Sequence, residues 1–194
     1  MPSDFQAASS MAIDTETMGL NTQRDRLCLV QISNGDGDAH LVQLDGQNYQ
    51  APNLKKILEN KDILKIFHYA RFGIAALEYY LEIKMTNFYC TKIASKLART
   101  YTEFHGLKDI CNELAGVNIS KTQQSSNWSA AKLTEAQKKY AAQDVLYLHQ
   151  IKEKLDIILA QTGRADLAKS CFDFLSTRVQ LDLEGWLGID IFKH

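Results

Sequence analysis

The stretch that decides the fold is Met11-Ala12-Ile13-Asp14-Thr15-Glu16, in which an apolar run leads into two acids. Side chains alternate across a β-strand, so Asp14 and Glu16 are expected to project from the same face. Two neighbouring carboxylates repel each other, and a divalent cation between them would relieve that repulsion, because Mg²⁺ prefers oxygen ligands. Taken alone, the pair fits the exposed end of an ordinary strand equally well. Its meaning depends on which other residues the fold brings to it.

Further short apolar runs follow this stretch and predict a meander of strands. They cover residues 27–32, 39–44 and 63–67 and are separated by turns rich in Gly, Asn and Asp. The cluster Asn34-Gly35-Asp36-Gly37-Asp38 is the strongest turn signal in the chain and predicts a hairpin between antiparallel strands.

The second half of the chain shows mainly helical spacing of its apolar residues. This spacing predicts helices over 53–59, 71–81, 92–98 and 107–114. Thr134 and Gln137 form a capping box, which predicts the start of a long amphipathic helix that runs to about residue 161 and ends at Gly163. A last helix is expected from 165 to about 175 and beyond. Strands first and helices later indicate a mixed α/β domain.

Length and composition narrow the class of protein. A chain of 194 residues, 45% hydrophobic and 23% charged, predicts a single globular domain over 1–194. The first ten residues carry no basic segment followed by an apolar one, and no run of eighteen apolar residues occurs, so no membrane partner and a cytoplasmic location are expected. The cysteines form no C-x-x-C pair, which indicates free, mostly buried thiols: Cys28, Cys90, Cys111 and Cys171.

The net charge of the chain limits the kind of nucleic acid that it could bind. The formal net charge is −1, from 22 basic and 23 acidic residues. Proteins that grip long nucleic acids through their phosphates carry a clear basic excess. Any nucleic-acid substrate is therefore expected to be short.

Tyr140 and Asp144 stand four residues apart on the predicted long helix, so a phenol and a carboxylate share one helix face. Such a pair alone also fits a surface hydrogen bond or a wall of the core. Together with Asp14 and Glu16, however, it suggests one polar site.

Three segments resemble the DEDD exonucleases of the subclass that uses tyrosine, a family similar to ribonuclease D. They are Ile13-Asp-Thr-Glu-Thr-Met-Gly-Leu20, Lys65-Ile-Phe-His-Tyr-Ala-Arg-Phe72 and Tyr140-Ala-Ala-Gln-Asp144, in the family's order and spacing. The stretches 90–95 and 121–128 resemble the small stand-alone members called nanoRNase C. The resemblance implies a ribonuclease H-like exonuclease fold with a mixed central sheet flanked by helices. It also implies a bare catalytic domain without the additional C-terminal RNA-binding domains of ribonuclease D.

The resemblance also implies an activity, the 3′–5′ hydrolysis of short RNA oligonucleotides such as dinucleotides. Two Mg²⁺ or Mn²⁺ ions would be held by Asp14, Glu16 and Asp144, while Tyr140 would orient the attacking water. The residues expected to hold the substrate are Thr15, Met18, Gly19, Leu20, His68, Arg71, Lys121, Gln124, Ser126 and Trp128. For Trp128 a core-capping role and base stacking stay open, and His105 fits a structural role equally well.

Gly73 departs from the family pattern, which places a fourth carboxylate directly after Arg71-Phe72. Glycine costs about 0.8–1.0 kcal/mol relative to alanine inside a helix, so helix stability does not call for it. We interpret it as an Asp→Gly change, made deliberately or arisen by chance, in an otherwise intact exonuclease. The chain is expected to be severely impaired in hydrolysis and to keep substrate binding.

Two other functions remain open from the sequence: a non-catalytic nucleic-acid-binding or scaffold protein, supported by Gly73 alone, and a DNA-directed 3′ exonuclease. The resemblance further implies a homo-oligomer in the form of a ring. The apolar tail from Trp186 to Phe192 is a candidate contact between its subunits.

Overall fold

A five-stranded mixed sheet forms the centre of the computed structural model, which describes residues 5–194; the first four of the ten N-terminal residues considered above lie outside it. The strand order is β3-β2-β1-β4-β5. The strands are β1 (Ser10–Thr17), β2 (Leu27–Ser33), β3 (His40–Gln43), β4 (Leu64–Phe67) and β5 (Phe88–Cys90). The first three form the predicted antiparallel meander, whereas β4 and β5 run parallel to β1.

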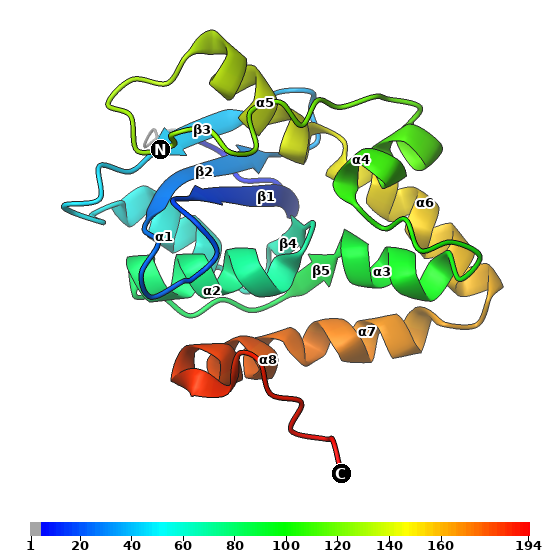
Figure 1. The fold of residues 1–194 in the computed structure, drawn as a ribbon. Helices are drawn as coiled ribbons and strands as arrows, with labels where there is room; N and C mark the ends of the chain where they lie inside the picture. Colours follow the sequence, from blue (N-terminus) through cyan, green and yellow to red (C-terminus); the bar gives the residue numbers. More distant parts are fainter. Residues whose placement is uncertain (1–4) are drawn as a thin grey trace.

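Helices cover both faces of the sheet (Figure 1). Helix α5 (Glu135–Leu146) packs against β1, β2 and β3, while α2 (Ala70–Leu81) packs on the opposite face. The other helices are α1 (Pro52–Glu59), α3 (Thr91–Ala98), α4 (Leu107–Ile110), the π-helical turns η1 (Cys111–Ala115) and η2 (Asp182–Trp186), α6 (Leu148–Gln161), α7 (Ala165–Asp173) and α8 (Leu175–Leu181). The C-terminal helices α7 and α8 form a further layer against α3 and α2.

The alternation of β1 sends its residues to two different surroundings. Ile13 and Thr15 point to the face covered by α2, and Ile13 belongs to the main apolar core. Asp14 and Glu16 point to the face covered by α5. The predicted mixed α/β architecture, a central sheet flanked by helices, is confirmed. No helix within 5–194 is long and apolar enough to cross a membrane.

The structure corrects two predicted helices and adds one strand. Strand β5 was not predicted because it has only three residues, preceded by Asn87 with a φ of +64°. The long helix is wrong as a single element: it breaks at Tyr147 (φ −104°, ψ −3°), so that α5 can lie on the sheet while α6 packs against α3. The stretch 107–114 divides into α4 and η1. The Thr134 capping box is confirmed, and the predicted end of the helical stretch at Gly163 is also confirmed, where the backbone has a positive φ of +66° after α6.

Candidate active site

A cleft of about 710 Å³ opens beside the end of β1 and collects residues from every segment singled out in the sequence. Its walls come from β1 and the loop after it, from the start of α2, from the 119–128 loop and from α5. The predicted residues among its lining are Asp14, Thr15, Glu16, Met18, Gly19, Leu20, His68, Lys121, Gln124, Ser126, Trp128, Tyr140 and Asp144. Arg71 and Gly73 are not part of this lining.

Three carboxylates in the cleft perturb one another. Burial, together with the nearby charges of Asp14 and Asp144, raises the pKa of Glu16 to about 9. Burial also raises the pKa values of Asp14 and Asp144, and Asp144 is additionally raised by the charge of Asp14. Without a bound cation, the site therefore does not favour the ionised form of all three carboxyl groups at neutral pH.

Tyr140 stands one helical turn from Asp144 and packs against Trp128, with ring centroids 5.9 Å apart. Burial and the three neighbouring carboxylates raise the pKa of Tyr140 well above its usual value, so its hydroxyl keeps its proton. Trp128 is only 2% exposed and belongs to a small core cluster under α5. Of the two roles left open for Trp128, this burial favours the core-capping one, which also fixes the Tyr140 ring.

The loop after β1 presents two apolar side chains at the mouth of the cleft. Met18 is 46% and Leu20 79% exposed. Between them, Gly19 is required by close packing, because a Cβ atom there would lie 2.2 Å from Asp25 Oδ2. Asp25 in turn accepts a hydrogen bond from the Asn21 backbone N–H (2.9 Å), which closes the loop.

His68 enters the cleft from the start of α2 as a neutral side chain. Burial, together with the positive charges of Lys92 and Lys121, lowers the pKa of His68 to about 3. The Thr91 hydroxyl donates to the Phe67 carbonyl oxygen (3.1 Å), so it accepts from His68 Nδ1 (2.9 Å). The other ring nitrogen, Nε2, is left as an acceptor.

Several residues of the cleft were not predicted from the sequence. They include Tyr69, Phe72, Lys92, Lys108 and Ser120. The first three lie inside segments that resemble the exonuclease family, so their position in these segments could have marked them as residues of the site. Lys108 had none, because only the fold brings the start of α4 to the cleft. His105 lies outside this lining: it is buried and hydrogen-bonds to Ser95 (2.9 Å), which fits a structural role.

Gly73 lies behind the carboxylates, on the α2 side of β1. A Cβ atom at Gly73 would stand 3.7 Å from Thr15 Oγ1 and 3.1 Å from the Phe67 ring. The Thr15 hydroxyl is buried and lacks a hydrogen-bond partner within the described structure. A larger side chain at position 73 would therefore lie next to the unpaired Thr15 hydroxyl. It would also require the Phe67 ring to shift slightly.

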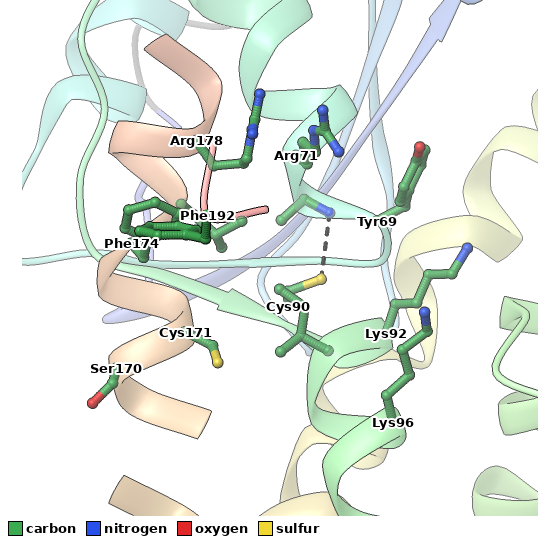
Figure 2. A pocket seen from close by; sticks show the side chains of 13 residues that line it. Tyr69, Arg71, Cys90, Lys92, Lys96, Ser170, Cys171, Phe174, Arg178 and Phe192 are labelled. Carbon is green, nitrogen blue, oxygen red and sulfur yellow. Dashed lines mark hydrogen bonds between the residues drawn. The ribbon is translucent and has the colours of Figure 1, made fainter. Parts of the chain in front are cut away.

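A second cavity, of about 500 Å³, adjoins the cleft at Tyr69 and Lys92 (Figure 2). It lies between α2, α3 and α7, and Phe174 and Phe192 close one side of it. Cys90 and Cys171 both line it. Basic residues stand around its apolar wall: Arg71, Lys92, Lys96 and Arg178.

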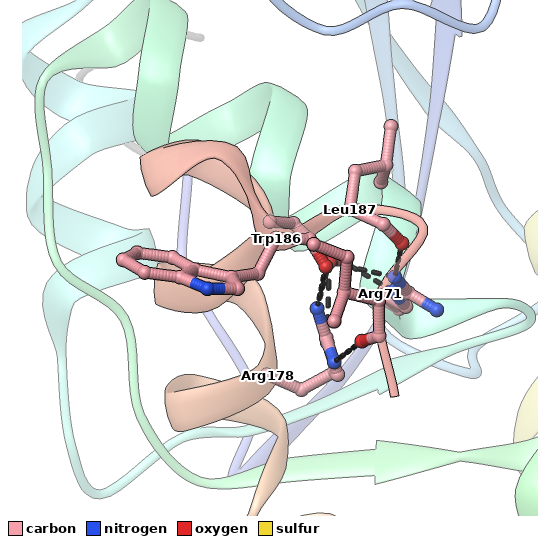
Figure 3. Close-up of polar contacts among 6 residues, drawn as sticks. Arg71, Arg178, Trp186 and Leu187 are labelled. Atoms are coloured by element: carbon pink, nitrogen blue, oxygen red, sulfur yellow. Dashed lines mark hydrogen bonds and ion pairs between the residues drawn. The ribbon is translucent and has the colours of Figure 1, made fainter. Parts of the chain in front are cut away.

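Arg71 is turned away from the carboxylates and holds the C-terminal tail (Figure 3). Its guanidinium donates two hydrogen bonds to Asp182 (2.5 and 2.6 Å) and one to the Leu187 carbonyl oxygen (2.6 Å). Arg178 donates to the same carboxylate and to the Trp186 carbonyl oxygen (both 2.6 Å). Three of the five N–H donors of Arg71 are engaged with the tail, and Arg71 lies outside the lining of the cleft, so a substrate-holding role for Arg71 stays a prediction.

The donor set suits hard divalent cations. Asp14, Glu16 and Asp144 offer only carboxylate oxygens, the ligands that Mg²⁺ prefers, and a cation would relieve the repulsion that raises their pKa values. Among residues 5–194 no three His, Cys, Asp or Glu side chains are already gathered in ligating positions. The carboxylate side chains would therefore have to move to ligate a shared cation.

Fold and site together define a class of nuclease. Residues 2–160 match the model of a family described as 3′–5′ exonuclease, and the chain belongs to this family. It is similar to NrnC of Brucella melitensis: a structure of that protein bound to pGG is 53% identical, with a TM-score of 0.94 over 99% of this chain and 93% of that one. A structure of the same protein with bound Mg²⁺ is 52% identical, with a TM-score of 0.93 over the same shares of both chains.

A curated relative is more distant. Ribonuclease D of Gluconacetobacter diazotrophicus is 30% identical over 166 residues, which cover 86% of this chain. The match covers 42% of that relative, so the chain spans less than half the length of the curated proteins it matches first.

Proposed function

We propose that this chain is built as a metal-dependent 3′–5′ exoribonuclease for very short RNA, with dinucleotides as its main substrate. The observation that carries the proposal is the meeting of Asp14, Glu16, Tyr140 and Asp144, from two distant segments, in one cleft. The similarity to NrnC, which has been solved bound to pGG and with bound Mg²⁺, supports the substrate class and the metal.

The proposed roles follow from the chemistry of each group. Asp14, Glu16 and Asp144 would hold the divalent cations, Mg²⁺ or Mn²⁺, which when bound activate water and stabilise the leaving 3′ oxygen. Tyr140 keeps its proton at neutral pH, so it orients the attacking water through its hydroxyl and does not remove a proton itself.

The rest of the cleft is suited to hold a short substrate. Lys92 and Lys121 provide positive charge for phosphate groups, while the neutral His68 offers an acceptor for a sugar hydroxyl. Met18 and Leu20 are placed to contact the terminal nucleotide. The overall charge of −1 argues against a grip on long nucleic acid.

Gly73 is proposed to impair hydrolysis while leaving binding in place. The contacts that would hold base, sugar and phosphate come from other residues, whereas position 73 would supply a carboxylate behind β1. A second candidate function, a nucleic-acid-binding protein without catalysis, rests on this same residue. The clustered carboxylates speak against it, because a pure binder gains nothing from acids beside a phosphate backbone.

A panel of labelled RNA and DNA oligonucleotides of two, three and seven nucleotides tests the proposal. The chain and its Gly73→Asp variant are assayed side by side with Mn²⁺. We expect the variant to cleave the RNA dinucleotide fastest and the unmodified chain to bind it with little cleavage. Equal cleavage of DNA would support the DNA-directed alternative, and absence of cleavage by both proteins would support the binder.

Self-association through the C-terminal tail is part of the proposal. Trp186, Leu187, Ile189, Ile191 and Phe192 are each at least 41% exposed, and Phe192 borders the apolar cavity of Figure 2. Such a surface is typical of a protein contact, and a closed ring would admit short substrates while excluding long ones. Light scattering of the chain and of a Phe192→Glu variant tests this: the variant should shift to a smaller mass.

A further inference from the structure

Gln31 is a buried polar residue that the fold does not explain. It lies in the middle of β2, is 0% exposed, and neither its Nε2 nor its Oε1 has a hydrogen-bond partner within the described structure. An unpaired buried amide is costly, and native proteins keep few of them. An apolar residue of the same size would be expected here unless the amide serves another purpose.

The strand register places Gln31 directly beside the proposed metal site. Gln31 pairs with Asp14 across the antiparallel β1–β2 ladder, so both side chains point to the α5 face of the sheet. Side chains in such a pair have Cβ atoms about 4.5–5.5 Å apart, within reach of a glutamine amide. On its other side Gln31 pairs with Leu41, which offers no polar group.

We infer that Gln31 is a positioning residue for Asp14: its amide N–H donates to the Asp14 carboxylate when that group holds a cation. The inference rests on the proposed function, since it needs a cation at Asp14. The Gln31 amide is then unpaired in the metal-free protein and pairs only with the metal-bound Asp14 carboxylate. The unpaired amide lowers the stability of the metal-free fold. Gln31 acts through Asp14 and does not touch the substrate.

Gln43 provides a control at an exposed position of the same sheet. It is also a glutamine of the same sheet, one strand further from β1, where it pairs with Leu29. Its amide is already engaged, because Nε2 donates to the Ala130 carbonyl oxygen (2.7 Å). Removing this amide breaks a structural hydrogen bond, whereas removing that of Gln31 breaks none in the metal-free protein.

The test compares Gln31→Met and Gln43→Met in the Gly73→Asp background, with Mn²⁺ affinity measured by calorimetric titration and stability by thermal unfolding in EDTA. Partners of ligating side chains typically change metal affinity by about 10- to 100-fold. For Gln31→Met we expect Mn²⁺ binding weakened to that degree, with an unchanged or higher Tm. For Gln43→Met we expect unchanged Mn²⁺ binding and a lower Tm. Dinucleotide hydrolysis by Gln31→Met should recover at saturating Mn²⁺, with KM for the dinucleotide unchanged.

Two results would overturn the inference. Unchanged Mn²⁺ affinity in Gln31→Met would show that the amide does not act on Asp14. A lower Tm or a failure to fold would show that it is paired in the metal-free protein, for instance through a buried water. If the Gly73→Asp parent binds no Mn²⁺, the proposed function itself fails. This failure can be distinguished from failure of the Gln31 inference, because it is measured in the parent, in which Gln31 is unchanged.

Discussion

Thr15 and Gly73 face each other across the contact between β1 and α2, with Thr15 Oγ1 3.7 Å from the point where a Cβ of residue 73 would stand. The hydroxyl is buried and unpaired in the described structure. A carboxylate at position 73 would begin close enough to accept its hydrogen bond. The buried surroundings of position 73 are therefore suited to a side chain that accepts a hydrogen bond from Thr15.

Replacing Gly73 by Asp should raise the rate of dinucleotide hydrolysis by roughly 10²-fold or more, comparable to the effect of one well-placed electrostatic group on a transition state. The Gly73→Ala variant is the matched control, since it adds the same Cβ beside Phe67 without a carboxylate. It should stay as slow as the unmodified chain. Equal rates for the Asp and Ala variants would remove Gly73 as the cause of impairment.

Above neutral pH the metal-free protein should lose stability as the pH rises. The raised pKa values of Asp14, Glu16 and Asp144 mean that these carboxyl groups hold protons more tightly in the folded than in the unfolded chain. Their contribution to stability is complete below the unfolded values of 3.8 and 4.5 and is lost as the pH rises through the folded values, up to about 9 for Glu16. Thermal unfolding in EDTA at several pH values should show this decline.

Mn²⁺ should reverse that decline, because metal binding requires the deprotonated carboxylates and so grows stronger with pH. The gain in Tm on adding Mn²⁺ should therefore be larger at pH 9 than at pH 6. A Glu16→Gln variant, which cannot titrate at this position, should show a flatter pH dependence in EDTA. A metal effect independent of pH would contradict the proposed ligands.

Replacing Tyr140 by Phe should lower kcat in the Gly73→Asp background by about 10²–10⁴-fold, the range for a group that handles the attacking water. The ring packing on Trp128 is kept, so stability and dinucleotide affinity should change little. Single-turnover rates and equilibrium binding separate these effects. A loss of binding equal to the loss of rate would argue for a substrate-holding role instead.

Replacing Asp182 by Asn should loosen the C-terminal tail. Its carboxylate is 4% exposed and accepts from both Arg71 and Arg178, so both lose a charged partner. Loss of a buried hydrogen-bonding partner costs about 1–3 kcal/mol. Hydrogen exchange over 186–192 should speed up. The exposed pair Lys169–Asp173 is the control, and Asp173→Asn should leave stability nearly unchanged.

Local patterns predicted much of the fold. The alternation around Asp14 and the turn at Gly35 and Gly37 carried enough information for the meander, because their causes lie within a few residues of chain. Strand β5 and the break at Tyr147 depend on neighbours distant in sequence, so no local pattern marked them.

The site was predictable to the same extent. The spacing of Asp14 and Glu16, and of Tyr140 and Asp144, fixed which side chains share a face, and the structure brings both pairs to one cleft. The position of Arg71 was not predictable in this way. Its partner Asp182 lies 111 residues away, and only the return of α8 along α2 brings the two together.

The arrangement of the thiols has a practical consequence. Cys28, Cys90 and Cys111 are buried, whereas Cys171 is partly exposed on the wall of the cavity that Phe192 borders. A maleimide dye should therefore label the native protein mainly at one place without any mutagenesis. That dye would sit beside the tail, where its emission and rotational freedom report directly on whether another subunit has docked.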